Sequence, residues 1–292
     1  MSWRTIVITG NTKLDYKMGY LVVRKKDEIK QVHLSEIEVL LVESTAVSLT
    51  TMLLCELIKS KVNVIFCDNK HNPVSELISM YGSHDTSAKV REQVFFSTEV
   101  KGKIWTKIVE NKIRKQSEVL LMAGCDREAM MLESYIEQLE YNDSTNREGH
   151  AAKVYFNALF GKSFSRDDDN SINAALNYGY GILLSYFNRE IVTNGYMTQF
   201  GIFHNNIFNH FNLSSDLMEP YRPLIDRTVF NMNPNVFETE EKHELLRIFD
   251  NEVKINNQTQ TVSNSIKIYV QSIFNSLREE NEYLIRFYNY EL

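Results

Sequence analysis

The spacing of apolar residues changes once along this chain, and that change limits the possible folds more than any other sequence feature. Before residue 83, short β-branched runs separated by polar turns predict strands at residues 6–8, 20–23, 37–42 and 62–66, with one helix between Leu49 and Ile58. From residue 88 onward, nearly all apolar positions repeat with the period of a helix. The chain is therefore predicted to be an α+β protein, with a small β-rich part followed by a larger helical part.

The expected domain boundary lies after Pro73, in the polar stretch at residues 83–87, where the strand-like pattern stops. We expect a β-rich N-terminal domain at residues 1–82, a linker at 83–95 and a larger α-helical domain at 96–292. Within the helical part, the apolar period predicts helices at 88–122, 126–140, 145–159, 171–192, 200–211, 215–229, 239–250 and 262–289.

Composition excludes several classes of protein. With 43% hydrophobic and 24% charged residues, 11 Gly and 4 Pro in 292 residues, the chain is neither collagen-like nor disordered. Cys55, Cys67 and Cys125 are odd in number and lie in apolar contexts, which predicts reduced, buried thiols. Neither a signal-peptide pattern nor a run of 18 apolar residues is present, so we expect a cytoplasmic protein with no membrane partner.

One basic segment stands out in a chain of net charge −6. Residues 101–115 contain six Lys and Arg against a single acid, interleaved with apolar residues at helical spacing. The pattern predicts an amphipathic helix with a cationic outer face. That face is either a solvated surface or a site for DNA phosphates, with Lys103, Lys107 and Arg114 as the candidate contacts.

Glu148 admits two interpretations. In the segment Thr145-Asn146-Arg147-Glu148 it fits a capping box, in which its carboxylate would only satisfy a backbone amide at a helix start. It also shares a helix stripe with Ala151, Tyr155 and Leu159, the side expected to turn inward. A carboxylate on an apolar face needs a cation, a hydrogen-bond network or a metal, so a catalytic or metal-binding role stays open.

A second group of candidate residues follows in the chain. Asp216 and Glu219 are three residues apart and so share a helix face, and His204 precedes them. One imidazole and one or two carboxylates could converge with Glu148 on a divalent ion, for which such mixed ligands favour Mg²⁺ or Mn²⁺. The sequence has no Gly-rich phosphate loop and no nucleophile elbow, which argues against ATP-driven and acyl-transfer chemistry.

Three segments together resemble the CRISPR-associated integrase, the catalytic subunit of the CRISPR spacer-acquisition complex. They are residues 147–156, residues 177–180, and residues 201–204 with 216–223. The resemblance covers essentially the whole chain and includes the order of a β-rich part before a helical part. The compact, Asn-rich form is most similar to the integrases of type II-A systems.

The resemblance implies the site and its chemistry. Glu148, His204 and Glu219 would be the catalytic ligands of a Mg²⁺ or Mn²⁺ ion, with Asp216 as an accessory acid and Arg222 as either a phosphate clamp or part of an ion pair. Many members carry Asp where this chain has Glu219. The 3′-hydroxyls of a prespacer duplex would attack phosphodiesters at the ends of a CRISPR repeat, with no need for a nucleoside triphosphate.

The resemblance also implies the partners. They are double-stranded DNA, both prespacer and leader-repeat, a second copy of the chain bound through the N-terminal domain, and the small dimeric subunit of the adaptation complex. The type II-A assignment adds the RNA-guided effector nuclease and a further adaptation protein. Two other functions stay open at this point: a metal-dependent DNA endonuclease that uses water as its nucleophile, and a noncatalytic DNA-binding scaffold.

Overall fold

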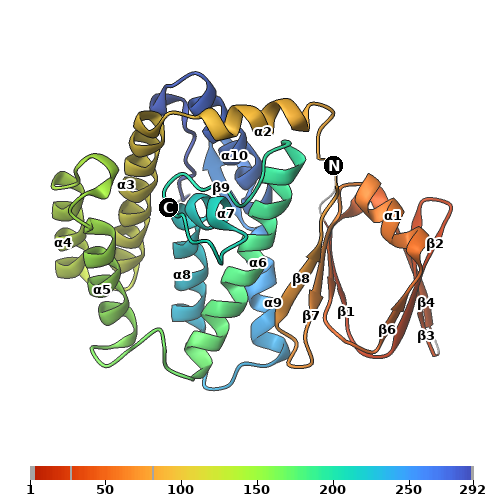
Figure 1. Ribbon diagram of the computed structural model, residues 1–292. Helices are drawn as coiled ribbons and strands as arrows, with labels where there is room; N and C mark the ends of the chain where they lie inside the picture. Colours follow the sequence, from red (N-terminus) through yellow and green to blue (C-terminus); the bar gives the residue numbers. More distant parts are fainter. Residues whose placement is uncertain (1–3, 27, 81, 291–292) are drawn as a thin grey trace. The chain divides into compact units, whose positions relative to one another are not determined.

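The computed structural model describes residues 4–26, 28–80 and 82–290, and it divides into two compact units, Met1–Gly82 and Ser83–Leu292 (Figure 1). The first unit is built mainly of strands and the second mainly of helices, which confirms the predicted α+β class. In the part of the chain that is described, no helix is both long and apolar enough to cross a membrane.

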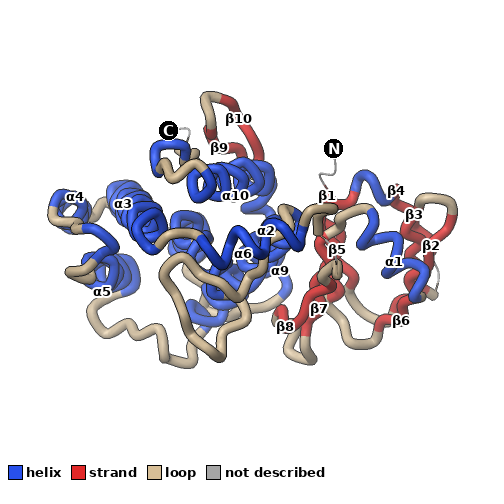
Figure 2. The backbone as a smooth tube through the Cα atoms, turned by 45° about the horizontal axis from the view of Figure 1, so that its top comes forward, coloured by secondary structure: helices blue, strands red, loops and turns tan. Residues whose placement is uncertain are grey.

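The described residues of the N-terminal unit form two four-stranded sheets. The first has the order β1-β5-β7-β8, in which β1 (Arg4–Ile8), β5 (Ile37–Val42) and β7 (Asn63–Cys67) are parallel and β8 (Pro73–Leu77) is antiparallel. The second has the order β4 (Glu28–His33), β3 (Tyr20–Lys25), β2 (Thr12–Lys17) and β6 (Val47–Leu49). Leu14, Leu40 and Leu53, from the two sheets and helix α1 (Thr51–Lys59), belong to one core. Figure 2 shows the strands and α1 of this unit. Both sheets therefore depend on the same apolar cluster.

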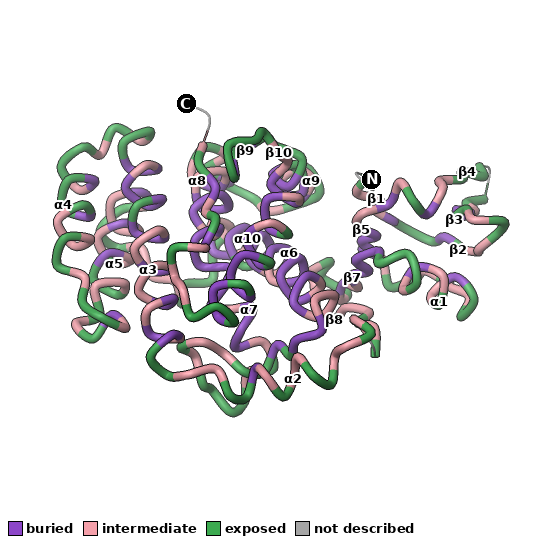
Figure 3. The backbone as a smooth tube through the Cα atoms, turned by 90° about the horizontal axis from the view of Figure 1, so that it is seen from above, coloured by how far each residue is buried: buried purple, intermediate pink, exposed green. Residues whose placement is uncertain are grey.

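The second unit is organised around helix α3. Its helices are α2 (Thr86–Phe95), α3 (Thr98–Met122), α4 (Asp126–Glu137), α5 (Arg147–Phe160), α6 (Ser171–Thr193), α7 (Asn212–Leu217), α8 (Arg222–Met232), α9 (Thr239–Arg247) and α10 (Val262–Arg278). Helix α3 contacts α4, α5 and α8 as well as the 3-10 turn η3 (Glu219–Tyr221), while α6 contacts α8, α9 and α10. Figure 3 shows that α3 and α6 are among the most buried helices. Segments distant in sequence therefore meet along α3.

The structure of this unit differs from the sequence prediction at several places. Residues 83–95, predicted as a linker, contain α2. The helix predicted for 262–289 ends at Arg278, shortly before Glu280 takes a left-handed φ of 51°. A hairpin of β9 (Glu252–Ile255) and β10 (Gln258–Thr261) joins α9 to α10 and was not predicted.

The segment at 200–211, also predicted as a helix, is an irregular loop. The side-chain amide of Asn212 donates to the backbone carbonyls of Gln199 (3.2 Å), Asn206 (3.0 Å) and Asn209 (3.1 Å). Asn side chains that bond to nearby backbone compete with the hydrogen bonds of a helix. The loop therefore replaces helical bonds with side-chain bonds that converge on one residue.

Helices α6 and α8 approach each other at Gly179. A Cβ atom built on Gly179 would lie 2.4 Å from Cγ2 of Ile225, closer than packed carbon atoms can stand. Both residues are buried. The missing side chain thus sets the distance between α6 and the helix that carries Arg222 and Asp226.

We predict that Gly179→Ala destabilises the protein by roughly 1–3 kcal/mol, because overpacking outweighs the gain of about 1 kcal/mol in helix propensity. Ile225→Ala alone should cost roughly 2–5 kcal/mol by leaving a cavity. The double variant should be more stable than the sum of the two losses implies, because the added methyl then enters the space left by Ile225. Urea unfolding would measure all three, and additive losses would contradict this packing.

Candidate active site

Glu148 is free to reach across to another helix because other side chains satisfy the start of α5. The N-cap residue is Asn146, whose Oδ1 accepts from the backbone N–H of Gly149 (3.3 Å). The carboxylate of Asp143 accepts from the N–H groups of Arg147 (2.7 Å) and Glu148 (3.1 Å). The capping-box interpretation of Glu148 is therefore wrong, and its side chain is available for a site.

The ammonium of Lys112 lies between two carboxylates. Its Nζ is 2.5 Å from Oε1 of Glu148 and 2.5 Å from Oε2 of Glu219. The Lys112 side chain is 9% exposed and that of Glu219 6% exposed, so these charges meet largely out of water. Burial lowers the pKa of Lys112, but the charges of Glu219 and Glu148 raise that pKa by more. The pKa of Lys112 therefore lies above its ordinary value. The pair of carboxylates thus creates a position that stabilises a positive charge.

Glu219 is also bound from its other side. Oε1 of Glu219 lies 2.9 Å from Nε of Arg222, whose guanidinium lies 4.6 Å above the ring of Tyr180. Burial raises the pKa of Glu219, yet Arg222 and Lys112 together bring that pKa below its ordinary value. Glu219 is therefore ionised. Of the two roles predicted for Arg222, a phosphate clamp or part of an ion pair, the structure shows the ion pair, with Glu219.

Asp216 organises the loop that carries His204. Its buried carboxylate accepts backbone N–H groups from Ile202 (2.6 Å), Phe203 (2.9 Å) and His204 (3.1 Å), and it also bonds to Nδ1 of His204. That last hydrogen bond raises the pKa of His204 against the effect of burial, and the charges of Glu219 and Glu148 raise it further. Asp216 therefore orients the imidazole and leaves Nε2 as the nitrogen available to a ligand.

Gly201 makes this loop possible. A Cβ on Gly201 would lie 2.2 Å from the carbonyl oxygen of His204 and 2.8 Å from Oδ2 of Asp216. Next to it, the ring of Phe203 stacks on buried Trp105 at 4.5 Å, and His204 meets the same indole edge-on at 5.7 Å. The loop is thus fixed to α3 by aromatic contacts and to α7 by a carboxylate.

The turn that carries Glu219 is supported from the end of the chain. The hydroxyl of Tyr288 donates to the carbonyl of Pro220 (3.1 Å), and the hydroxyls of Tyr221 and Ser265 are 3.1 Å apart. Tyr288 and Tyr221 are fully buried. Residues more than 40 positions away in sequence therefore hold the backbone on which Glu219 depends.

The basic segment is less cationic on its surface than the sequence predicted. Lys112 and Lys115 are buried rather than on the outer face, and Lys115 pairs with Glu118 at 2.9 Å. The three candidate DNA contacts pair with acids of the same helix: Lys103 with Glu99 (2.5 Å), Lys107 with Glu110 (2.8 Å) and Arg114 with Glu110 (3.2 Å). Their role in DNA binding stays a prediction.

The oxygens of Glu148 and Glu219 and Nε2 of His204 are the atoms that could hold a divalent cation. No group of three or more His, Cys, Asp or Glu side chains in residues 4–26, 28–80 and 82–290 is arranged to hold a metal ion, and the ammonium of Lys112 lies between the two carboxylates. Both oxygens of Asp216 already accept hydrogen bonds from the loop. Asp216 is therefore suited to support His204 rather than to act as a ligand.

Comparison with known proteins identifies the family. The model of the CRISPR associated protein Cas1 family matches residues 5–247. The chain belongs to the Cas1 family. It is 33% identical over 232 residues to the CRISPR-associated endonuclease Cas1 of Neisseria meningitidis serogroup C, covering 80% of this chain and 76% of that protein. A second relative, CRISPR-associated endonuclease Cas1 1 of Francisella tularensis subsp. novicida, is 25% identical over 240 residues, or 75% of each chain.

Solved structures share the fold of this Cas1 family member. A casposase bound to its integration product has a TM-score of 0.77 at 17% identity, covering 96% of this chain and 92% of that one. A chain of a Cas6-RT-Cas1–Cas2 complex has a TM-score of 0.74 at 19% identity; the match covers 97% of this chain but only 36% of that longer chain. The Thermotoga maritima Cas1 protein has a TM-score of 0.56 at 15% identity. At these identities the likeness concerns the fold.

Sequence reasoning missed two buried groups near the site, Lys112 and Asp226. Lys112 follows Trp105 and Ile108 at seven and four residues, so its place on the buried stripe of α3 was visible in the sequence. Asp226 bonds to the hydroxyl of Tyr180, 46 residues away, and no local pattern reveals that pair. Burial raises the pKa of Asp226 to about 6, although Tyr180 and Arg222 lower it.

We predict that Asp226 makes stability depend on pH. Because its pKa of about 6 in the folded protein exceeds its ordinary value of 3.8, the folded state keeps a proton that the unfolded chain loses. The stability that Asp226 contributes should therefore fall as pH rises from 4 to 6. Relative to wild type, Asp226→Asn should gain on the order of 2–3 kcal/mol between pH 4 and pH 7 in urea unfolding. Parallel curves for the two proteins would contradict the shift.

Proposed function

We propose that this Cas1 family member is a divalent-metal-dependent DNA integrase that inserts prespacer DNA into a CRISPR array by 3′-hydroxyl attack on repeat phosphodiesters. The observation that carries the proposal is the convergence of Glu148 and Glu219, from two separate elements, on one buried position for a positive charge beside His204. The relatives named as CRISPR-associated endonucleases and the fold shared with a casposase support it.

The donor types at this position, two carboxylates and one imidazole, are those that bind a divalent cation. Two carboxylates already share one cation, the ammonium of Lys112. Asp216 holds His204 through Nδ1, in the way that carboxylates commonly orient a metal-binding histidine through its other ring nitrogen. Glu148, His204 and Glu219 would hold Mg²⁺ or Mn²⁺, which mixed oxygen and imidazole donors favour. When bound, such an ion supplies charge stabilisation at a phosphoryl group undergoing substitution.

The proposed reaction exchanges one phosphodiester for another. The oxygen of a terminal 3′-hydroxyl bonds to the phosphorus of a repeat phosphodiester, and the bond from that phosphorus to the repeat strand's 3′ oxygen breaks. The leaving oxygen takes the bonding electrons and a proton replaces the one lost by the attacking hydroxyl, so no triphosphate is consumed. In this chain, Lys112 holds Glu148 and Glu219 at one point, and Asp216 orients His204.

The nucleophile distinguishes the integrase from its main alternative. An endonuclease using water would cut the repeat whether or not the prespacer carries a free 3′-hydroxyl. We predict that prespacers ending in 3′-phosphate or a dideoxynucleotide still bind, because phosphate contacts dominate affinity, but are not joined to a repeat-containing plasmid. The measurement is strand transfer with the small partner subunit present, resolved on a denaturing gel. Nicking at an equal rate with blocked ends, without branched product, would favour the endonuclease.

Variants of the three proposed ligands belong in the same assay. Glu148→Ala, His204→Ala and Glu219→Ala should each lower joining by orders of magnitude while duplex binding persists. Arg127→Gln, on the exposed face of α4, serves as a control that should join at the wild-type rate. Near-normal joining by Glu148→Ala with intact DNA binding would support the scaffold alternative.

We extend the proposal to the assembly. The integrase would act as a homodimer through the β-rich unit, with the small dimeric subunit of the adaptation complex, on prespacer and leader-repeat DNA. A Cas1–Cas2 complex among the structures of similar fold supports the small subunit. Lys103, Lys107 and Arg114 would contribute phosphate contacts. The type II-A assignment adds the effector nuclease and a further adaptation protein as partners.

The homodimer is tested in solution. The N-terminal sheets end in the strands β1, β4, β6 and β8, and such edges are open to pairing or packing with a second chain. Light scattering at micromolar concentration should give twice the mass of the 34.1 kDa chain. A monomeric mass under those conditions would contradict the dimer.

A further inference from the structure

A cavity of about 230 Å³ opens next to the candidate site and shares Lys112, Glu219 and Arg222 with it. Its remaining walls come from α3, α5, α6, α8 and the loop between α5 and α6. The volume is below the roughly 300–1,000 Å³ of pockets that enclose a whole drug-sized ligand. It suits one unit of a longer molecule that continues into the candidate site.

Arg166 brings to this cavity a positive charge that forms no ion pair with a carboxylate of the described residues, although Glu219 and Asp226 also line the cavity. Its guanidinium donates to two side-chain amides, those of Asn173 (2.5 Å) and Asn177 (2.6 Å), and lies 5.4 Å from the ring centre of Tyr180 and 6.0 Å from that of Phe156. All four partners are uncharged. Within the described residues Arg166 thus differs from Arg222, which pairs with a carboxylate.

The arrangement leaves Arg166 ready for an anion. A guanidinium has five N–H donors in a fixed plane, and the two amides use two of them. The amides also fix the direction of the remaining donors, so little side-chain freedom is lost when a ligand binds. A guanidinium placed in this way recognises phosphate oxygens in a bidentate manner.

Gln116 supplies an independent sign of a missing ligand. It is 2% exposed and lines the same cavity, and its Oε1 atom has no hydrogen-bond partner among the described residues. An unpaired buried polar atom costs about 1–3 kcal/mol. Within a DNA strand, the groups that could donate to this oxygen are the amino and ring N–H groups of a base and, at a strand end, the terminal hydroxyl.

We propose that this cavity binds one nucleotide of the reacting DNA, with Arg166 on its phosphate and Gln116 on a donor of its base. The proposal rests on the proposed integrase function, because it places the nucleotide beside the phosphodiester that reacts. Arg166 is then a positioning residue. The nucleotide belongs either to the 3′ end of the prespacer or to the repeat strand next to the joint, and the test separates these two sources.

The test removes one phosphate charge at a time. Methylphosphonates replace each phosphate near the prespacer 3′ end in one series and each phosphate flanking the repeat joint in another. With wild-type protein and its partner subunit, one position should slow joining by about 10- to 100-fold. Arg166→Gln should join unmodified DNA more slowly by a similar factor and should no longer respond to that one substitution. The series that contains the position identifies the strand.

Matched variants separate positioning from a structural role. Arg166→Lys keeps the positive charge but lacks the planar N–H donors of a guanidinium, so it should still be slowed in part by the methylphosphonate at that position. Arg127→Gln should leave the whole scan unchanged. If Arg166→Gln fails to fold, the same scan with Arg166→Lys decides. An Arg166→Gln protein that stays sensitive at every wild-type position or joins at the wild-type rate, or an Arg166→Lys protein with the full wild-type response, would overturn the proposal.

A binding readout keeps this result independent of the integrase proposal. The scan is repeated as competitive duplex binding with the Glu148→Ala protein, which requires no joining. In this binding assay, one methylphosphonate should weaken the binding of Glu148→Ala but not that of the double variant Glu148→Ala/Arg166→Gln. That result supports the nucleotide site even if the wild-type protein joins no DNA. An unchanged binding scan overturns the nucleotide site even if joining depends on free 3′-hydroxyls.

Discussion

Sharing of one ammonium between Glu148 and Glu219 is the interaction on which the rest of the site depends. Two carboxylates held this close and largely out of water would repel each other strongly without a cation between them. Lys112 provides that cation from the middle of α3, and the site therefore exists only where α3, α5 and η3 meet. The fold of the helical unit thus brings α3, α5 and η3 together at the ammonium of Lys112.

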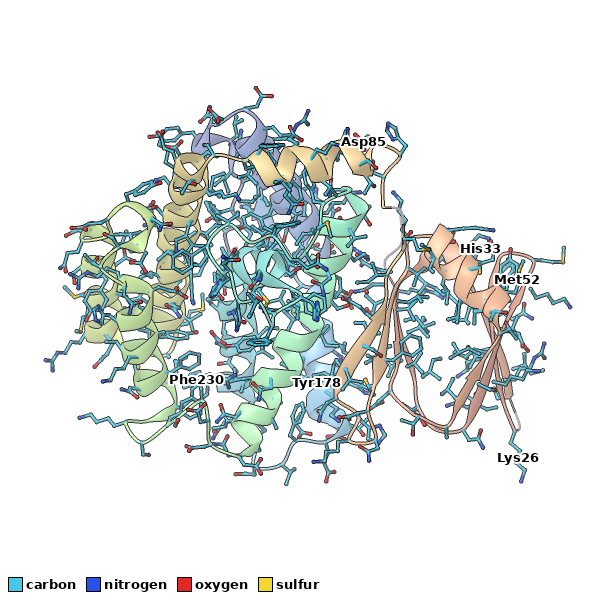
Figure 4. The ribbon with its side chains drawn as sticks, viewed as in Figure 1. Lys26, His33, Met52, Asp85, Tyr178 and Phe230 are labelled. Atoms are coloured by element: carbon cyan, nitrogen blue, oxygen red, sulfur yellow. The ribbon has the colours of Figure 1, made fainter. Side chains whose placement is uncertain are left out.

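The other groups near Lys112 lie on two sides of the site, one toward the loop of His204 and one toward the cavity of Arg166. Asp216 and Gly201 fix the loop of His204, and they do so through backbone contacts that tolerate little change. Arg222 and Tyr180 continue the polar region away from Glu219 toward the cavity of Arg166 (Figure 4 shows the side chains of this unit). One side of the site is thus packed protein, and the other opens to the cavity.

Sequence reasoning identified the fold class because the change of apolar period near residue 83 is a local signal that tertiary packing did not override. It selected Glu148 because a carboxylate on an inward stripe is costly, and the structure places that side chain in an ion pair. It failed at residues 200–211, where the bonds of Asn212 replace a helix, and at Asp226, whose partner lies on another helix. Those features depend on contacts across the fold that no local period encodes.

The bond from Tyr288 to the carbonyl of Pro220 affects how members of this family are compared. The match to the family model ends at residue 247 of this chain, yet Tyr288 supports the turn that presents Glu219. Alignments restricted to the matched region therefore leave out part of the framework of the site. Two relatives could share every residue of the proposed triad and still differ in how firmly Glu219 is held, because the difference would lie outside the matched region.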